Sequence, residues 1–135
     1  MNLSNATLND LPASVARPGY DRTTLTPGIV HIGPGAFHRA HQAAYVDSIL
    51  GVDPRWAISA VALNSTGVAD ALGPQDGLYT LALLDRETSH RVIGSITELL
   101  TAQRRDAILS RIAEPTTRLV TTTVTEKGYH LDGSG

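Results

Sequence analysis

Cysteine is absent from the 135-residue sequence, which excludes disulfide bonds, thiolate catalysis and cysteine-ligated zinc sites. An excess of either charge is also lacking, since 11 Lys and Arg residues against 13 Asp and Glu residues give a formal net charge of −2. No basic cluster offsets this balance, so we expect no nucleic-acid binding. No apolar run approaches the roughly 18 residues that a membrane helix needs, and residues 1–28 contain no signal-peptide core. We therefore expect a cytoplasmic protein without a membrane partner.

Apolar residues are plentiful: 41% of the chain is hydrophobic and 18% is charged, which suffices for the core of one domain. Residues 1–27 hold Ser, Thr, Asn and Pro without a sustained period and predict an extended N-terminal arm. The β-branched run 28–32 predicts a buried strand that ends at a glycine turn. Roughly helical spacing predicts a helix over 36–50, and 56–63 predicts a second strand. Together these segments predict a parallel, right-handed βαβ unit.

The rest of the chain shows a less regular pattern. A short helix is predicted over 66–72, and two strands over 78–84 and 90–96 flank a five-residue hairpin connection. Residues 101–113 predict a helix that ends before a proline, and the Thr- and Val-rich run 118–125 predicts a further strand. The fold class is α/β, a Rossmann-like parallel sheet with an inserted β-hairpin. A doubly wound sheet has about six strands, so three parallel candidates indicate only the front part of such a domain.

The turn after the first strand has residues suited to a dinucleotide phosphate. Gly33 makes the tight turn and Gly35 lets a pyrophosphate approach the backbone, where free N–H groups at the helix start hold the anion. His38 occupies the third glycine position of the G-x-G-x-x-G pattern, so the match is incomplete, and we expect Arg39 to reach a phosphate. The alternative is a tight turn of the kind any α/β protein uses. No carboxylate follows the second strand, where Asn64 is expected to contact the adenosine ribose, so NAD and NADP both stay open.

Other polar residues near the predicted strand ends carry less information. The histidines His31, His38 and His41 lack a carboxylate at metal-ligand spacing, so we predict no metal site. Glu126 and Lys127 follow the last predicted strand, and the carboxyl ends of parallel strands form the ligand-binding edge of such sheets. These two residues are predicted either to lie near the ligand or to form an exposed charge pair.

Four runs of residues carry a family resemblance: PGYDR at 18–22, GIVHIGPGAFHRAHQ at 28–42, PQDGLYTL at 74–81 and TVTEKGY at 123–129. Together they resemble the N-terminal domain of the mannitol dehydrogenase family, the polyol-specific long-chain dehydrogenases. The resemblance spans essentially residues 18–130.

The resemblance implies both a fold and an activity. It implies a partial NAD-binding Rossmann domain over 28–135, with a mostly helical C-terminal substrate domain that this sequence does not contain. It implies hydride transfer between a nicotinamide cofactor and a sugar alcohol or sugar acid, of the mannitol/fructose or mannonate/fructuronate type. It further implies a zinc-independent mechanism with a lysine as general acid/base in the later domain, and Lys127 does not match that lysine. We therefore assign no catalytic residue and expect the chain alone to be inactive.

Cofactor contacts follow from the turn and from the resemblance. The expected cofactor-binding residues flank the turn or follow the second strand: Ile32, Gly33, Pro34, Gly35, Ala36, Phe37, His38, Arg39 and Asn64. The expected partner is a sugar alcohol or keto-sugar, bound through the later domain. The alternative function is a stand-alone nucleotide-binding or interaction module without turnover.

Overall fold

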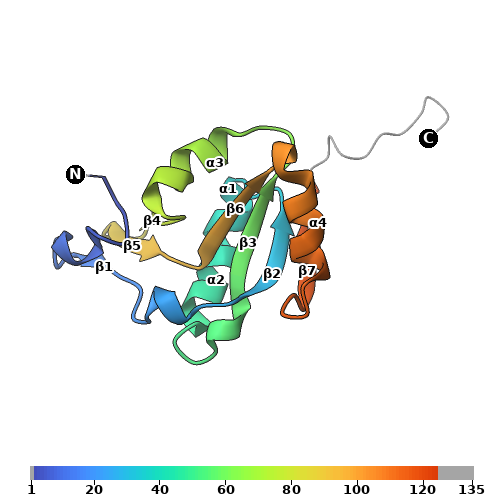
Figure 1. The fold of residues 1–135 in the computed structure, drawn as a ribbon. Coiled ribbons are helices and arrows are strands. Elements are labelled where there is room, and N and C mark those ends of the chain that lie inside the picture. The colour runs from blue at the N-terminus through green and yellow to red at the C-terminus, as the bar shows by residue number, and fades with distance from the viewer. Residues whose placement is uncertain (1, 125–135) are drawn as a thin grey trace.

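The computed structural model describes residues 2–124, which form a mixed α/β fold (Figure 1). The strands are β1 (Val15–Ala16), β2 (Pro27–Ile32), β3 (Ala57–Ala62), β4 (Tyr79–Leu83), β5 (Ser89–Ile93), β6 (Ile96–Thr101) and β7 (Leu119–Thr122). The α-helices are α1 (Ala36–Ala40), α2 (Gln42–Ile49), α3 (Gly67–Leu72) and α4 (Arg105–Ala113). Short 3-10 helices connect them: η1 (Leu8–Asp10), η2 (Arg22–Thr24), η3 (Pro54–Trp56), η4 (Gly73–Gln75) and η5 (Ala102–Arg104). The predictions for Thr125, Glu126 and Lys127 lie outside the described residues.

Within the described residues, four parallel strands form the main sheet in the order β6-β3-β2-β7. All six residues of β3 and the four middle residues of β2 are buried, because the two central strands of a parallel sheet are covered on both faces. The hairpin β4–β5 is inserted between α3 and β6. The predicted class, an α/β fold with a parallel sheet and an inserted hairpin, is confirmed.

The prediction of one strand over 90–96 is wrong. β5 ends at Ile93, and after Gly94 and Ser95 a separate strand, β6, joins the main sheet beside β3. The sheet therefore has one more parallel strand than the sequence predicts. The helix predicted over 101–113 starts later than expected, because the chain first forms η5 and becomes α-helical only in α4.

The prediction of one helix over 36–50 is also wrong, since α1 and α2 are separate helices. His41 between them has φ −117° and ψ −88°, which is outside the helical region. Its backbone N–H donates to the carbonyls of Phe37 and His38, and its ring nitrogen bonds the Phe37 carbonyl at 2.8 Å. The break lets the two helices bury different side chains. α1 buries His38, whereas α2 buries a face that begins at Ala43.

The helices cover both faces of the main sheet, and the chain changes from one face to the other in the crossover from β6 to β7. Successive residues of a strand point to opposite faces, so Ile29 lies in one apolar cluster with Ala43 and Ala44 of α2, whereas Val30 lies in another with Ile108 of α4. Figure 1 shows α4 on the other side of the sheet from α2 and α3. The boundary between β2 and β7 is therefore the topological switch point, where ligands bind in open α/β sheets.

The N-terminal segment is packed against the hairpin. β1 pairs in parallel with β5 and completes a second sheet in the order β1-β5-β4. The Arg22 guanidinium donates to the carbonyl oxygens of Gly94 at 3.0 Å, Asp76 at 2.7 Å and Ile96 at 2.9 Å. The segment predicted as an extended arm thus holds a strand and an arginine that ties it to the start of β6.

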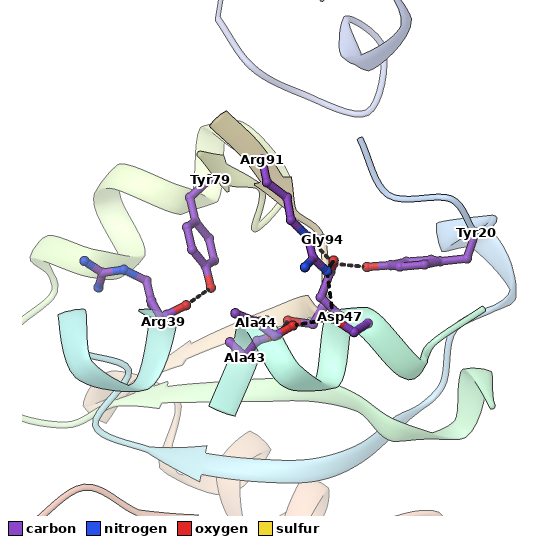
Figure 2. Close-up of polar contacts among 10 residues, drawn as sticks. Tyr20, Arg39, Ala43, Ala44, Asp47, Tyr79, Arg91 and Gly94 are labelled. Atoms are coloured by element: carbon purple, nitrogen blue, oxygen red, sulfur yellow. Dashed lines mark hydrogen bonds and ion pairs between the residues drawn. The ribbon is translucent and has the colours of Figure 1, made fainter. Parts of the chain in front are cut away.

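A buried carboxylate fastens the hairpin to α2 (Figure 2). Asp47, 4% exposed, accepts hydrogen bonds from the Tyr20 hydroxyl, from the Gly94 backbone N–H at 2.8 Å and from Arg91 Nη2 at 2.6 Å. Burial and the adjacent Asp47 carboxylate raise the pKa of Tyr20 far above its ordinary value, so the phenol stays a donor. Three segments distant in sequence therefore meet at one side chain.

Arg118, which precedes β7, makes contacts with a residue of β2 and with the residue before β3. The Arg118 backbone N–H donates to the Gly28 carbonyl at 2.8 Å, and the Arg118 guanidinium lies 5.2 Å above the centre of the Trp56 ring. This cation–π contact joins the residue before β7 to the residue before β3.

None of the helices within residues 2–124 is long and apolar enough to cross a membrane.

Candidate functional site

The turn after β2 has the backbone geometry that a bound anion requires. Gly33 has φ +91°, which glycine adopts without strain, and its N–H donates to the Val61 carbonyl at 2.9 Å. The N–H of Gly35 donates to the Gly33 carbonyl at 2.7 Å. A Cβ added at Gly35 would meet only the Gly33 oxygen, at 4.0 Å, so the outer side of the turn is open. The chain therefore bends tightly at Gly33 and exposes its backbone at Gly35, as a pyrophosphate site requires.

The start of α1 supplies free hydrogen-bond donors at this open side. Within residues 2–124 the backbone N–H groups of Ala36, Phe37 and His38 have no acceptor, as expected for the first turn of a helix. Because α1 has only five residues, its dipole is smaller than that of a long helix, and the individual N–H groups provide most of the attraction for an anion. The donor set suits a phosphate oxygen.

The side chain of His38 points into the protein and not toward the open turn. It is 2% exposed, and its ring stacks on that of His31 with the centroids 3.5 Å apart and the planes inclined by 7°. Within residues 2–124, neither ring nitrogen of His38 has a hydrogen-bond partner. Burial, with lesser effects of His31 and Arg39, lowers the pKa of His38 to about 3, so the ring is neutral at pH 7. A stacked imidazole pair thus fills the space where the third glycine would let helix and strand approach.

His31 connects β2, the turn and β7, a role that the sequence interpretation missed. Its Nδ1 bonds the Thr121 hydroxyl at 2.8 Å, and its Nε2 lies 3.1 Å from the Thr123 hydroxyl and 3.2 Å from the Gly33 carbonyl. Burial lowers the pKa of His31. The available signal was the period-2 spacing of Thr121 and Thr123, which places both hydroxyls on one face of their strand.

Two further predicted residues lie on the surface of α1. Phe37 is 68% exposed and stacks on His41 with ring centroids 4.3 Å apart. Arg39 Nη1 donates to the Pro34 carbonyl at 2.7 Å, so the guanidinium lies against the turn. The Tyr79 hydroxyl donates to the Arg39 carbonyl at 2.6 Å, which brings the hairpin against the end of α1 (Figure 2). The structure therefore places a cation beside the open backbone of the turn.

An open pocket of about 570 Å³ adjoins the turn between α1, α2 and β7. Its lining includes the exposed apolar side chains of Phe37, Tyr45 and Val124 together with the hydroxyl-bearing Thr121 and Thr123. The pocket lies at the carboxyl ends of β2 and β7, the switch point of the sheet. Aromatic rings and hydroxyls at this place suit a flat, uncharged ring.

Asn64 lies apart from the turn, exposed in the loop that follows β3. The same loop enters α3, where the Gly67 N–H donates to the Ser65 hydroxyl at 3.2 Å and the Thr66 hydroxyl donates to Asp70 Oδ2 at 2.7 Å. The nearest carboxylate after β3 is thus bound within α3 and its cap. Asn64 is free to contact a ligand at the carboxyl edge of β3.

The predicted cofactor residues from Ile32 to Arg39 surround the turn, with the His38 side chain directed inward. Metal-ligating groups are not gathered here, because no cluster of three or more His, Asp or Glu side chains with metal-binding geometry occurs in residues 2–124. His31 and His38 instead stack on each other. The described residues at this edge thus offer backbone donors, an arginine and an amide to an anionic ligand.

Comparison with known proteins shows which proteins this chain resembles. The chain is 44% identical to mannitol 2-dehydrogenase of Phaeosphaeria nodorum over 98% of its own length and 24% of that protein. It is 41% identical to D-mannonate oxidoreductase of Escherichia coli, with 95% of this chain and 28% of that protein covered. The chain thus spans about a quarter of the length of these curated relatives.

A solved structure has the same fold. A ternary complex of Pseudomonas fluorescens mannitol 2-dehydrogenase with NAD and D-mannitol superposes with a TM-score of 0.88 and 40% sequence identity, covering 95% of this chain and 27% of that one. Residues 27–132 match the sequence profile of the family described as the mannitol dehydrogenase Rossmann domain. This match confirms the resemblance predicted from the sequence motifs, and the chain therefore belongs to the mannitol dehydrogenase family.

Proposed function

We propose that this chain is the NAD-binding portion of an oxidoreductase that transfers a hydride between a nicotinamide cofactor and a sugar alcohol or sugar acid. The observation that carries the proposal is the Gly33–Gly35 turn, open on its outer side and placed at the switch point between β2 and β7. Family membership supports the same function, since one relative is named a mannitol 2-dehydrogenase and another a D-mannonate oxidoreductase. The matching solved structure is a complex with NAD and D-mannitol.

The proposed cofactor contacts follow from the donors at the turn. The pyrophosphate lies against the N–H groups of Ala36 and Phe37, with the guanidinium of Arg39 beside it. Ile32 and Pro34 flank the turn, Gly33 and Gly35 shape it, His38 contributes its backbone N–H, and Asn64 contacts the adenosine ribose. When bound, the nicotinamide ring accepts or donates the hydride, and the protein supplies its position and surroundings.

The proposed domain organisation assigns chemistry and binding to different parts of a longer protein. Residues 1–27 form an N-terminal segment and residues 28–135 the NAD-binding portion. A mostly helical substrate domain, with the lysine that serves as general acid/base, is proposed for the remaining part by analogy with the family. The small-molecule partner is a sugar alcohol or keto-sugar bound by that domain, so we place no catalytic residue in this chain.

Titration with NADH tests the binding site directly. The chain has one tryptophan, so energy transfer from Trp56 to the reduced nicotinamide reports binding. We expect Gly35→Val to weaken NADH binding by about tenfold or more, because the new side chain separates the phosphate from the backbone donors. The fold should tolerate the change, since Gly35 has extended backbone dihedrals and no close neighbour.

Gly19→Val is the matched control, because a Cβ at Gly19 meets no atom within 4 Å and Gly19 lies far from the turn in sequence. Unchanged NADH affinity in Gly35→Val, or equal losses in both variants, would contradict the proposed site. Turnover is sought in parallel with mannitol, fructose, mannonate and fructuronate. Clear turnover by the 135-residue chain would contradict the assignment of the catalytic groups to another domain.

A further inference from the structure

Two loops run side by side at the carboxyl edge of β3 and β6. Ala62, the last residue of β3, pairs with Thr101, the last residue of β6, and paired strands lie about 4.8 Å apart. Asn64 follows two residues after Ala62, and η5 begins immediately after Thr101. Figure 1 shows the loop from β3 to α3 and the start of η5 at the same end of the sheet. Both loops therefore border the place where the adenosine ribose of a dinucleotide lies.

The loop between β3 and α3 contains no acidic residue. An NAD-selective fold places a carboxylate here to bind the ribose 2′-hydroxyl, and the same carboxylate repels a 2′-phosphate. In this chain Asn64, Ser65 and Thr66 are exposed and provide one amide and two hydroxyls. Asp70 is the first carboxylate after β3 and is engaged by the Thr66 hydroxyl at 2.7 Å. Residues Asn64 to Thr66 can therefore hydrogen-bond a phosphate, and the first carboxylate after them belongs to α3.

The neighbouring loop supplies positive charge. Arg104 ends η5 and Arg105 begins α4, and both are exposed. Within residues 2–124 neither guanidinium takes part in a salt bridge or a side-chain hydrogen bond. The nearby carboxylate of Glu98 is already bound to Arg111 Nε at 2.7 Å, although Arg104 contributes to its lowered pKa. Even with Asp106 next in the chain, the loop has a net positive charge.

We infer that this site accepts NADP(H) as well as NAD(H), with the 2′-phosphate between the Asn64–Thr66 loop and Arg104–Arg105. The inference rests on the proposed function, because the dinucleotide must first bind at the glycine turn. Asn64 is then the specificity-determining residue. Its amide hydrogen-bonds the 2′-hydroxyl of NAD and also donates to the 2′-phosphate of NADP. A carboxylate at this position would hydrogen-bond the 2′-hydroxyl of NAD but repel the 2′-phosphate of NADP.

Parallel titrations of the 135-residue chain with NADH and NADPH test this inference, with energy transfer from Trp56 as the readout. We expect dissociation constants within about tenfold of each other. Asn64→Asp should weaken NADPH binding by about tenfold or more and leave NADH binding unchanged or stronger, because a carboxylate beside a phosphate is a like-charge contact. Arg105→Gln should weaken only NADPH binding. Arg86→Gln, in the exposed hairpin loop, is the matched control and should change neither affinity.

Adenosine 2′,5′-bisphosphate provides a second ligand, whose own binding does not depend on the nicotinamide. It should displace NADH from the unmodified chain at a lower concentration than from Asn64→Asp. Binding of NADH without NADPH would overturn this inference and leave the proposed function intact. Binding of neither dinucleotide would overturn both, and equal losses of NADH and NADPH in Asn64→Asp would overturn the assignment of Asn64.

Discussion

The imidazole pair of His31 and His38 replaces a glycine with a buried, titratable contact. The pair holds α1 on β2 through ring stacking at 3.5 Å, while His31 alone carries the hydrogen bonds to Thr121 and Thr123. The two buried ring nitrogens of His38 have no partner among the residues that the structure describes, which costs stability relative to an apolar ring of similar size. Burial lowers the pKa of both rings, so protonation of either ring costs stability.

The stability of the fold should depend on pH through this pair. The pKa of His38 is about 3 in the folded protein against an ordinary value of 6.5, so between these values the unfolded chain binds more protons. The free energy of unfolding therefore falls as the pH drops below about 6.5. The lowered pKa of His31 acts in the same direction.

His38→Phe should reduce this dependence, since phenylalanine preserves the stacking and does not titrate. Between pH 7.5 and 5.5 we expect the unmodified chain to lose about 1 kcal/mol more than the variant. Urea unfolding at both pH values measures the difference. His90→Gln alters an exposed histidine of β5 and should retain the full dependence. Equal pH slopes for His38→Phe and the unmodified chain would contradict the buried neutral pair.

At the scale of elements, the Asp47 carboxylate decides how the hairpin and the N-terminal segment sit on α2. Asp47→Ala removes the acceptor of the Tyr20 hydroxyl, the Gly94 N–H and the Arg91 guanidinium. We expect the free energy of unfolding to fall by about 3 kcal/mol, because three donors lose a buried ionic partner. Denaturant unfolding measures the loss. Asp85→Ala, in the exposed hairpin loop, is the control, and a similar small effect in both variants would show that Asp47 does not fasten the hairpin.

Local sequence was sufficient to predict the elements whose pattern depends on their own residues. The strand predicted over 28–32 is observed as β2, and the short helix predicted over 66–72 is observed as α3. β6 was missed because Glu98 interrupts its apolar pattern. In the fold that carboxylate accepts hydrogen bonds from Ser59 at 2.5 Å and from Arg111 at 2.7 Å. Those partners come from β3 and α4, so no local pattern reveals that the position can enter a sheet.

The candidate site, too, could be predicted only in part from local sequence. The turn could be predicted because its backbone conformation demands glycine at Gly33, and because the G-x-G spacing adds a second glycine at Gly35. The contact of His31 with Thr121 could not, because it depends on the register of β7 beside β2, 90 residues away. The break at His41 also escaped, since it follows from the inward packing of His38 and not from a helix-breaking residue.

At the scale of the whole molecule, the main sheet has an apolar border at β7. Among residues 2–124, β7 pairs only with β2, and its Leu119 and Val120 are 44% and 48% exposed. An unpaired edge of this kind is a template for another strand. We therefore expect the 135-residue chain to associate with itself as its concentration rises.

Val120→Lys should reduce that association, because a charge on an edge strand disfavours strand addition. Light scattering over a concentration series measures the mass of the particles. Val52→Lys places the same charge on a residue that is 90% exposed and lies in the turn after α2, and it should leave the association unchanged. Identical behaviour of the two variants would exclude the β7 edge as the contact.

The contact of Arg118 with Trp56 makes the tryptophan fluorescence sensitive to the position of β7. The guanidinium that sits above the single indole belongs to the residue just before β7, so loosening of that strand withdraws a positive charge from the chromophore and shifts the colour of its emission. A dinucleotide bound at the proposed site, at the other end of the strands, would instead lower the emission by energy transfer and leave that charge in place. One native fluorophore can thus report sheet integrity by wavelength and ligand occupancy by intensity, with no label added.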